Sequence, residues 1–134
     1  MSPAPRKPRP VPRPLAGLTS RAVAPGEAIF REGDDPRGEA FLVQAGRVEI
    51  RRRVGGTDRA IRVLPAGELV GELALFRGTP HSASAVALEP TTVLVIPAAR
   101  LLSLVRSRPS LAVALIRQLA ERLREAEERR PSAS

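Results

Sequence analysis

Hydrophobic residues occur in short runs along the chain, and turn residues separate these runs from Thr19 onward. The turn signals include Pro25-Gly26, Gly55-Gly56 and Pro65-Ala66-Gly67, and they recur at intervals of roughly eight to twelve residues. This rhythm is typical of a β-sandwich or a β-barrel. We therefore expect strands at residues 28–30, 40–44, 47–53 and 59–64.

Apolar and charged residues alternate in the segment RVEIRRRV. Val48 and Ile50 share one face of an extended chain, whereas Arg47 and Glu49 share the other. This alternation indicates an antiparallel sheet with one buried and one solvated face. Gly46 directly precedes the segment and suits a tight hairpin with a positive φ. We interpret all the turn glycines in this way and treat only Gly71, discussed below, as different.

The second half of the chain begins with two further strand-like segments, at residues 82–90 and 91–97. The latter, TTVLVIP, is almost continuously apolar, so it predicts a central core strand that Pro97 ends. Residues 98–109 predict a short helix closed by its final proline, and a longer helix capped by Ser110 follows.

Apolar residues of the longer helix are spaced alternately four and three apart, which makes a narrow seam of the coiled-coil type. Leu111 and Leu115 supply a neighbouring face for the barrel, so the seam is available to a second copy of the chain. We expect a homodimer through this helix, with packing of the seam on the barrel as the alternative. The seam consists of Ala112, Ile116, Leu119 and Leu123.

The composition excludes several classes of function. With 134 residues the chain has room for one domain, and without cysteine it has no disulfide, thiolate metal site or cysteine nucleophile. His81 is the only histidine, and no base and orienting acid accompany Ser82 or Ser84 as nucleophiles. We therefore predict no enzymatic activity, no metal and no cofactor. No apolar run reaches about 18 residues, so we expect no membrane span and a cytoplasmic location.

The formal net charge is +8, and half of this excess lies in residues 1–14. That segment has six prolines, four basic residues and no acid, so we expect a disordered arm. It is a solvated leader or a contact for an acidic partner, a membrane surface or nucleic acid. Because no aromatic residue lies among the charges, any contact with nucleic acid would be unspecific.

The segment from Gly71 to Ala85, GELALFRGTPHSASA, carries the main candidate chemistry. Its Gly-Glu opening predicts a short helix whose first N–H groups face an anion, and a glycine there lets a ligand approach the backbone. A carboxylate beside a phosphate needs a neighbouring hydroxyl, so Glu72 indicates a sugar phosphate as the ligand.

The order of these signals resembles the cyclic nucleotide-binding domains of the catabolite activator protein and of the protein kinase A regulatory subunits. The resemblance extends from about Thr19 to Glu128 and rests on several dispersed motifs. These motifs are Pro25-Gly26-Glu27, Ile29-Phe30-Arg31-Glu32-Gly33, Phe41-Leu42-Val43, Gly46-Arg47-Val48, Pro65-Ala66-Gly67 and Gly71-Glu72-Leu73-Ala74-Leu75.

The resemblance implies a mainly β protein, an eight-stranded jelly-roll β-barrel with a short cassette helix and C-terminal helices. The corresponding division of the chain is a disordered arm at 1–14, the barrel domain at 15–108, an amphipathic helix at 109–130 and a tail at 131–134. In this family the transcription factors continue into a DNA-reading module after the long helix. The chain ends at Ser134, so we expect a stand-alone domain.

The resemblance also implies roles for the cassette residues. Glu72 would receive the ribose 2′-hydroxyl, and the amides at the helix start would hold the cyclic phosphate. The family's phosphate-pairing arginine is replaced by His81, and Arg77 is an alternative phosphate contact. The expected ligand-binding residues are Gly71, Glu72, Leu73, Ala74, His81, Ser82 and Ala83.

Two functions are consistent with these residues. The first is a bacterial regulatory protein that senses a cyclic mononucleotide, cAMP before cGMP, and signals to an effector protein by moving its C-terminal helix against the barrel. The second is a degenerate domain that lost its ligand with the arginine and serves protein–protein interaction or dimerisation.

Overall fold

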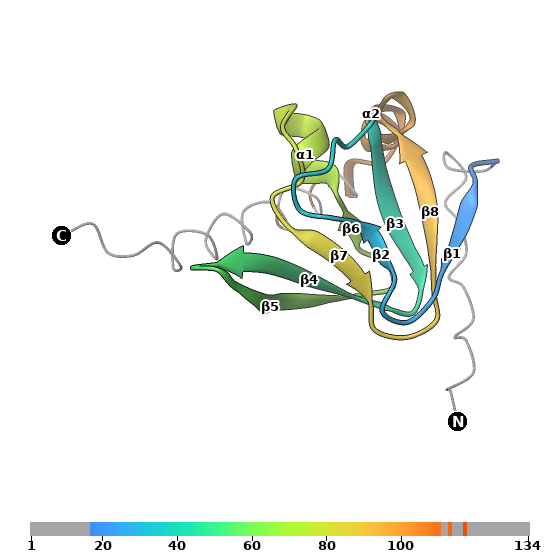
Figure 1. Cartoon of the computed structure of the whole chain (residues 1–134). Helices are drawn as coiled ribbons and strands as arrows, with labels where there is room; N and C mark the ends of the chain where they lie inside the picture. The colour runs from blue at the N-terminus through green and yellow to red at the C-terminus, as the bar shows by residue number, and fades with distance from the viewer. Residues whose placement is uncertain (1–16, 111–112, 114–116, 118–134) are drawn as a thin grey trace.

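Two antiparallel sheets of four strands each form the expected jelly-roll barrel (Figure 1). The computed structural model describes residues 17–110 together with residues 113 and 117. The sheets have the strand orders β1-β8-β3-β6 and β2-β7-β4-β5. The strands are β1 (Ser20–Val23), β2 (Ala28–Phe30), β3 (Glu39–Ala45), β4 (Arg47–Val54), β5 (Thr57–Pro65), β6 (Leu69–Val70), β7 (Ser84–Ala87) and β8 (Thr91–Pro97).

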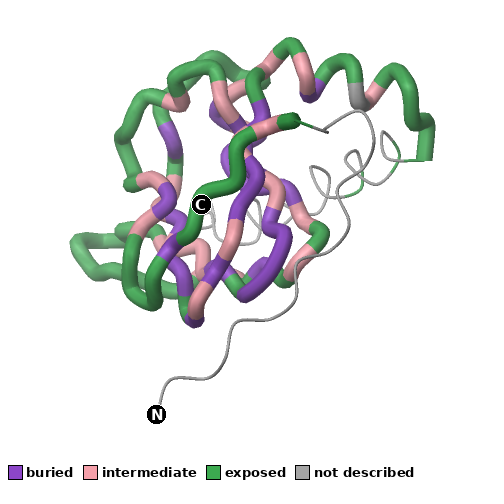
Figure 2. The backbone as a smooth tube through the Cα atoms, turned by 90° about the vertical axis from the view of Figure 1, so that its right-hand side faces the viewer, coloured by how far each residue is buried: buried purple, intermediate pink, exposed green. Residues whose placement is uncertain are grey.

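The core lies between the two sheets, where Figure 2 shows the buried stretches of backbone. In the first sheet β8 pairs with β1 on one side and β3 on the other, and its Val93 and Ile96 are fully buried. This confirms the prediction of a central strand at residues 91–97. In the second sheet the fully buried Val48 and Leu64 pair across β4 and β5. Removing such apolar surface from water stabilises the folded state by about 25 cal/mol for each Å² that is buried.

The outer half of the hairpin formed by β4 and β5 projects from the barrel (Figure 1). Its register shifts between Ile50 and Arg51, and beyond this irregularity Arg52 and Arg59 are directly opposite and exposed. The predicted alternation of a buried and a solvated face therefore describes only the inner half of β4. Among the described residues, no sheet faces this outer half, so most of its side chains stay exposed.

Gly46 joins β3 to β4 and has a φ of 95°, as the hairpin prediction requires. Turn geometry is only part of the reason for this glycine, so our interpretation of it was incomplete. A Cβ atom here would lie 2.4 Å from Thr91 Oγ1 and 2.7 Å from the Pro90 carbonyl oxygen. The hairpin and the start of β8 approach so closely that only glycine fits.

Helix α2 (Ala98–Ser107) follows β8 directly and packs on the first sheet through the buried Leu101. The prediction that the next helix is capped by Ser110 is wrong, because Pro109 and Ser110 are already helical. Proline suits a first helical turn, where its missing N–H has no partner in the helix. The seam residues Ala112, Ile116, Leu119 and Leu123, the arm at 1–14 and the tail at 131–134 lie outside the described residues.

Among the described residues, no helix is both long and apolar enough to span a membrane.

Candidate functional site

Helix α1 (Glu72–Arg77) lies in the connection from β6 of the first sheet to β7 of the second (Figure 1). It begins at the residue where the cassette helix was predicted to begin. Gly71 precedes it in the left-handed conformation, with a φ of 83°. Gly78 closes the helix, also with a positive φ, and its N–H donates to the carbonyl oxygen of Ala74. The two glycines thus define a helix of six residues between β6 and β7.

Gly71 is required for space as well as for its backbone conformation. A Cβ atom at this position would lie 3.1 Å from Cε2 of Phe30 and 3.2 Å from Cε1 of His81. We predicted that the glycine gives room to a ligand. In the structure the rings of Phe30 and His81 lie against it, so the fold brings the start and the end of the cassette together.

Glu72 is the first residue of α1 and its exposed fraction is 0%. Leu73 beside it is half-buried, and Ala74 is buried. Burying a carboxylate costs free energy, so a glutamate at such a position needs hydrogen bonds or charges around it. The arrangement fixes a carboxylate at the start of a short helix, where it can accept a hydrogen bond from a hydroxyl group.

His81 is buried as well, with an exposed fraction of 5%. Its backbone N–H donates to the Asp34 carbonyl oxygen at 2.9 Å, and its carbonyl oxygen accepts from the Gly33 N–H at 2.8 Å. Its ring stacks on Phe30, with ring centroids 3.6 Å apart and planes 9° apart. We refer to these two rings as the Phe30–His81 stack.

Burial of the ring lowers the pKa of His81, although the nearby carboxylates of Asp34 and Asp35 act in the opposite direction. The ordinary pKa of histidine is about 6.5. The imidazole is therefore predominantly neutral at pH 7, and it brings little positive charge to a phosphate before the phosphate arrives.

The remaining predicted residues, Arg77, Ser82 and Ala83, are more exposed than Glu72 and His81. Ser82 is exposed and Ala83 is half-buried, both just before β7. Arg77 is exposed in the last turn of α1.

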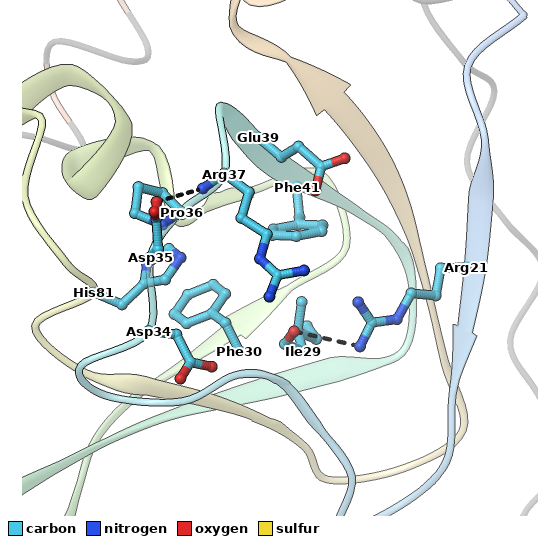
Figure 3. A pocket seen from close by; sticks show the side chains of 10 residues that line it. All are labelled: Arg21, Ile29, Phe30, Asp34, Asp35, Pro36, Arg37, Glu39, Phe41 and His81. Carbon is cyan, nitrogen blue, oxygen red and sulfur yellow. Dashed lines mark hydrogen bonds between the residues drawn. The ribbon is translucent and has the colours of Figure 1, made fainter.

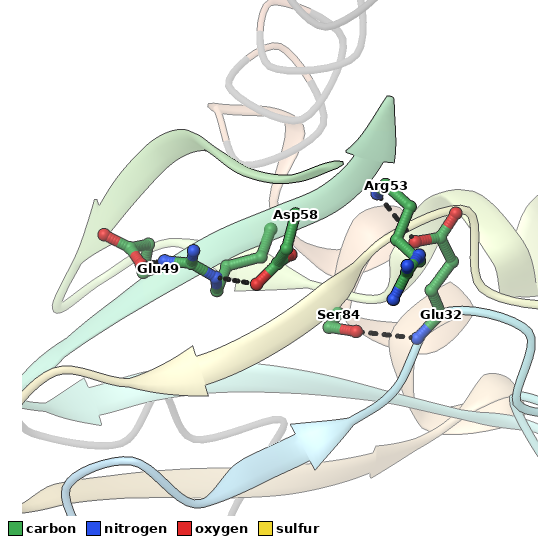
Figure 4. A network of polar contacts seen from close by, with 6 residues as sticks. Glu32, Glu49, Arg53, Asp58 and Ser84 are labelled. Carbon is green, nitrogen blue, oxygen red and sulfur yellow. Dashed lines mark hydrogen bonds and ion pairs between the residues drawn. The ribbon is translucent and has the colours of Figure 1, made fainter. Parts of the chain in front are cut away.

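The Ser84 side chain has a structural role. Its Oγ accepts a hydrogen bond from the Glu32 N–H at 2.8 Å, while Oε1 of Glu32 accepts from the Arg53 N–H at 3.0 Å (Figure 4). These bonds tie the segment after β2 to both β7 and β4. They hold the segment that carries the hydrogen bonds to His81.

A pocket of about 300 Å³ lies beside the Phe30–His81 stack (Figure 3). Of the residues predicted to bind a ligand, His81 is the one that lines it. The sequence analysis assigned no ligand contact to the other lining residues, which lie at positions 21–41 and therefore far from the cassette in the sequence. The lining residues are Arg21, Ile29, Phe30, Asp34, Asp35, Pro36, Arg37, Glu39, Phe41 and His81.

The part of the chain that the structure describes contains no group of three or more His, Asp or Glu side chains placed to hold a metal ion.

Comparison with known proteins gives consistent matches. The family model described as "Cyclic nucleotide-binding domain" matches residues 20–108. The cyclic AMP receptor protein of Thermus thermophilus is 40% identical over 115 residues, which cover 84% of this chain and 52% of that protein.

Solved structures give the same picture. The crystal structure of the Thermus thermophilus catabolite activator protein is 38% identical, with a TM-score of 0.72, over 85% of this chain and 54% of that one. The cAMP-bound form of the EAL enzyme Bd1971 is 29% identical, with a TM-score of 0.62, over 81% of this chain and 29% of that one. The chain thus spans about half the length of the Thermus proteins it matches.

Proposed function

The chain belongs to the cyclic nucleotide-binding domain family, and we propose that it is a regulatory protein that binds a cyclic mononucleotide, cAMP before cGMP. The observation that carries the proposal is the fully buried Glu72 at the start of α1, directly after a glycine at which a Cβ atom would crowd the Phe30–His81 stack. One short segment thereby offers a carboxylate that accepts a hydrogen bond from a sugar hydroxyl, next to the backbone N–H groups at the start of α1, which face an anion. The relatives' names are consistent with this ligand, since one is a cyclic AMP receptor protein.

In this proposal each end of the cassette recognises one part of the ligand. Glu72 accepts a hydrogen bond from the ribose hydroxyl. The phosphate meets the backbone N–H groups at the start of α1 together with His81, whose imidazole gains a proton as the anion binds. The domain acts by binding and not by catalysis, and it signals through the helix that follows α2. We propose a cytoplasmic location for such a regulator.

A second function is favoured by the state of His81. Because the ring is buried, stacked on Phe30 and predominantly neutral at pH 7, the phosphate side lacks the permanent charge of an arginine. The second candidate is therefore a domain that keeps the fold without the ligand and serves protein–protein interaction or dimerisation through Leu119 and Leu123. Charged substitutions at these two leucines test it, because they should then abolish the oligomer or the capture of a partner.

The experiment that tests the first function is a calorimetric titration with cAMP and with cGMP. We expect saturable binding that weakens about 10-fold to 150-fold in Glu72→Gln, because hydrogen bonds to charged groups contribute about 1.5 to 3 kcal/mol. Glu27→Gln is the matched control, since Glu27 is exposed and its substitution should leave the affinity unchanged. Equal affinities for the wild type and Glu72→Gln would contradict the proposed role of Glu72.

A further inference from the structure

The pocket beside the Phe30–His81 stack has an apolar floor that differs in chemistry from the cassette. Ile29, Phe30 and Phe41 form this floor. The rings of Phe30 and Phe41 have centroids 6.0 Å apart and planes tilted by 31°, and His81 extends the flat surface by stacking on Phe30. A floor of this kind favours a flat, apolar molecule.

Two guanidinium groups reach the pocket from opposite sides. Arg21 projects from β1 and Arg37 from the loop between β2 and β3, and Figure 3 shows both groups turned toward Ile29. Nη2 of Arg21 donates to the carbonyl oxygens of Ala28 and Ile29, each at 3.3 Å, which holds this group in place. Within the described part of the chain, neither guanidinium forms an ion pair with a carboxylate.

The loop holds Arg37 in an unusual backbone conformation. Arg37 has a φ of 54°, which makes it the one residue other than glycine with a positive φ in the described ranges. The Asp35 carboxylate fixes this conformation, because its Oδ1 accepts a hydrogen bond from the Arg37 N–H at 2.9 Å. A residue keeps a sparsely populated backbone conformation only where the surrounding structure compensates its strain, and such residues are common at ligand sites.

Among the described residues, the acidic residues of the lining form no ion pair with either arginine. Asp34 and Asp35 accept hydrogen bonds from backbone N–H groups of their own loop, and the Glu39 carboxylate points away from both guanidinium groups (Figure 3). These three carboxylates nevertheless disfavour a ligand with two negative charges. The pocket therefore suits at most a single negative charge, placed between the two guanidinium groups.

We propose that this pocket is a second ligand site, which binds a small organic carboxylate with a flat apolar body. The carboxylate lies between Arg21 and Arg37, whose planar groups match its two oxygens, and the body lies on Ile29, Phe30 and Phe41. A volume of about 300 Å³ suits a molecule of the size of an aryl acetate. Because His81 borders both this pocket and Gly71, an occupant touches the end of the cassette.

The test uses phenylacetate as the probe, with methyl and aromatic NMR signals of Ile29 and Phe41 as the readout in the full chain. We expect saturable shifts of both signals. The affinity should fall about tenfold or more in Arg21→Gln and in Arg37→Gln, because each removes a hydrogen bond between charged groups. Arg52→Gln is the matched control, since this exposed arginine lies on the projecting hairpin and should leave the affinity unchanged.

Further probes separate the parts of the proposal. Phenylacetamide, which lacks the charge, and inorganic phosphate, which lacks the apolar body, should each bind far more weakly than phenylacetate. The proposal is overturned if millimolar phenylacetate shifts neither signal, if phenylacetamide binds equally well, or if both arginine variants bind like the wild type. It is also overturned if cAMP produces the same shifts at lower concentration, since the pocket would then belong to the nucleotide.

Discussion

Glu72 and His81 are buried polar side chains at the two ends of the cassette, and the structure accommodates them in opposite ways. At the start of the cassette, Glu72 keeps a carboxylate with an exposed fraction of 0% in the first turn of a helix. At its end, burial lowers the pKa of His81 and the ring is stacked on Phe30 as a flat, predominantly neutral group. One end therefore holds a buried carboxylate, whereas the other has the packing of a core residue. The comparison teaches that one short segment can bury two polar side chains by different means.

The largest expected effect comes from restoring charge at the second end. We predict that His81→Arg tightens binding of cAMP about 30-fold to several thousand-fold, because one partner of a buried charge pair is worth about 2 to 5 kcal/mol. The planar guanidinium should also keep the stacking on Phe30, so the variant should fold. Calorimetry of the two proteins measures the difference.

His81→Lys provides the control for this substitution, because lysine brings the charge without the planar group. It should gain less affinity than His81→Arg. If His81→Arg leaves the affinity unchanged while its thermal unfolding stays cooperative, the two ends are not parts of one ligand site.

A smaller effect is expected from filling the space between the two ends. Gly71→Ala should lower the free energy of unfolding by about 2 kcal/mol or more, since the new Cβ would crowd both rings of the Phe30–His81 stack and would also have a positive φ. Gly26→Ala is a matched control, because Gly26 has the same φ of 83° with nothing within 4 Å of its Cβ position. In urea denaturation, Gly26→Ala should lower the free energy of unfolding by only about 1 kcal/mol. Equal losses in the two variants would contradict the close contact at Gly71.

The smallest expected effect is on the pH dependence of stability. Because burial lowers the pKa of His81 in the folded state, the unfolded chain binds this proton more readily. The contribution of His81 is fully present above about pH 6.5 and is lost as the pH falls from there toward the lowered folded pKa. Urea midpoints between about pH 7.5 and pH 5 should therefore fall more steeply for the wild type than for His81→Gln. Parallel slopes would show that the ring is not held neutral.

Much of the fold could be predicted from the pattern of residues. Six of the eight strands correspond to apolar runs between turn signals, and β2 has the predicted bounds. Strands β1 and β6 were not identified from the pattern, because β6 has two residues and β1 is exposed along most of its four. The cap of the second C-terminal helix was misassigned, because the serine signal was preferred to a proline in the first turn.

The candidate site was predictable only where its residues are close in the sequence. Gly71, Glu72 and His81 belong to one segment, and their motif identified them. The ring stacking joins Phe30 to His81, which are far apart in the sequence. The position of Arg37 depends on its positive φ and on the hydrogen bond that its backbone N–H donates to the Asp35 carboxylate. Such contacts arise from tertiary packing, which periodicity and turn signals do not encode.

The most direct test of the proposed function is a calorimetric titration of the wild-type chain with cAMP at about pH 6 and about pH 8. We predict saturable binding that is tighter at the lower pH, because the phosphate stabilises the protonated form of His81 and binding then takes up a proton. The absence of heat and of competition with a labelled nucleotide at millimolar cAMP, at both pH values, would contradict the account.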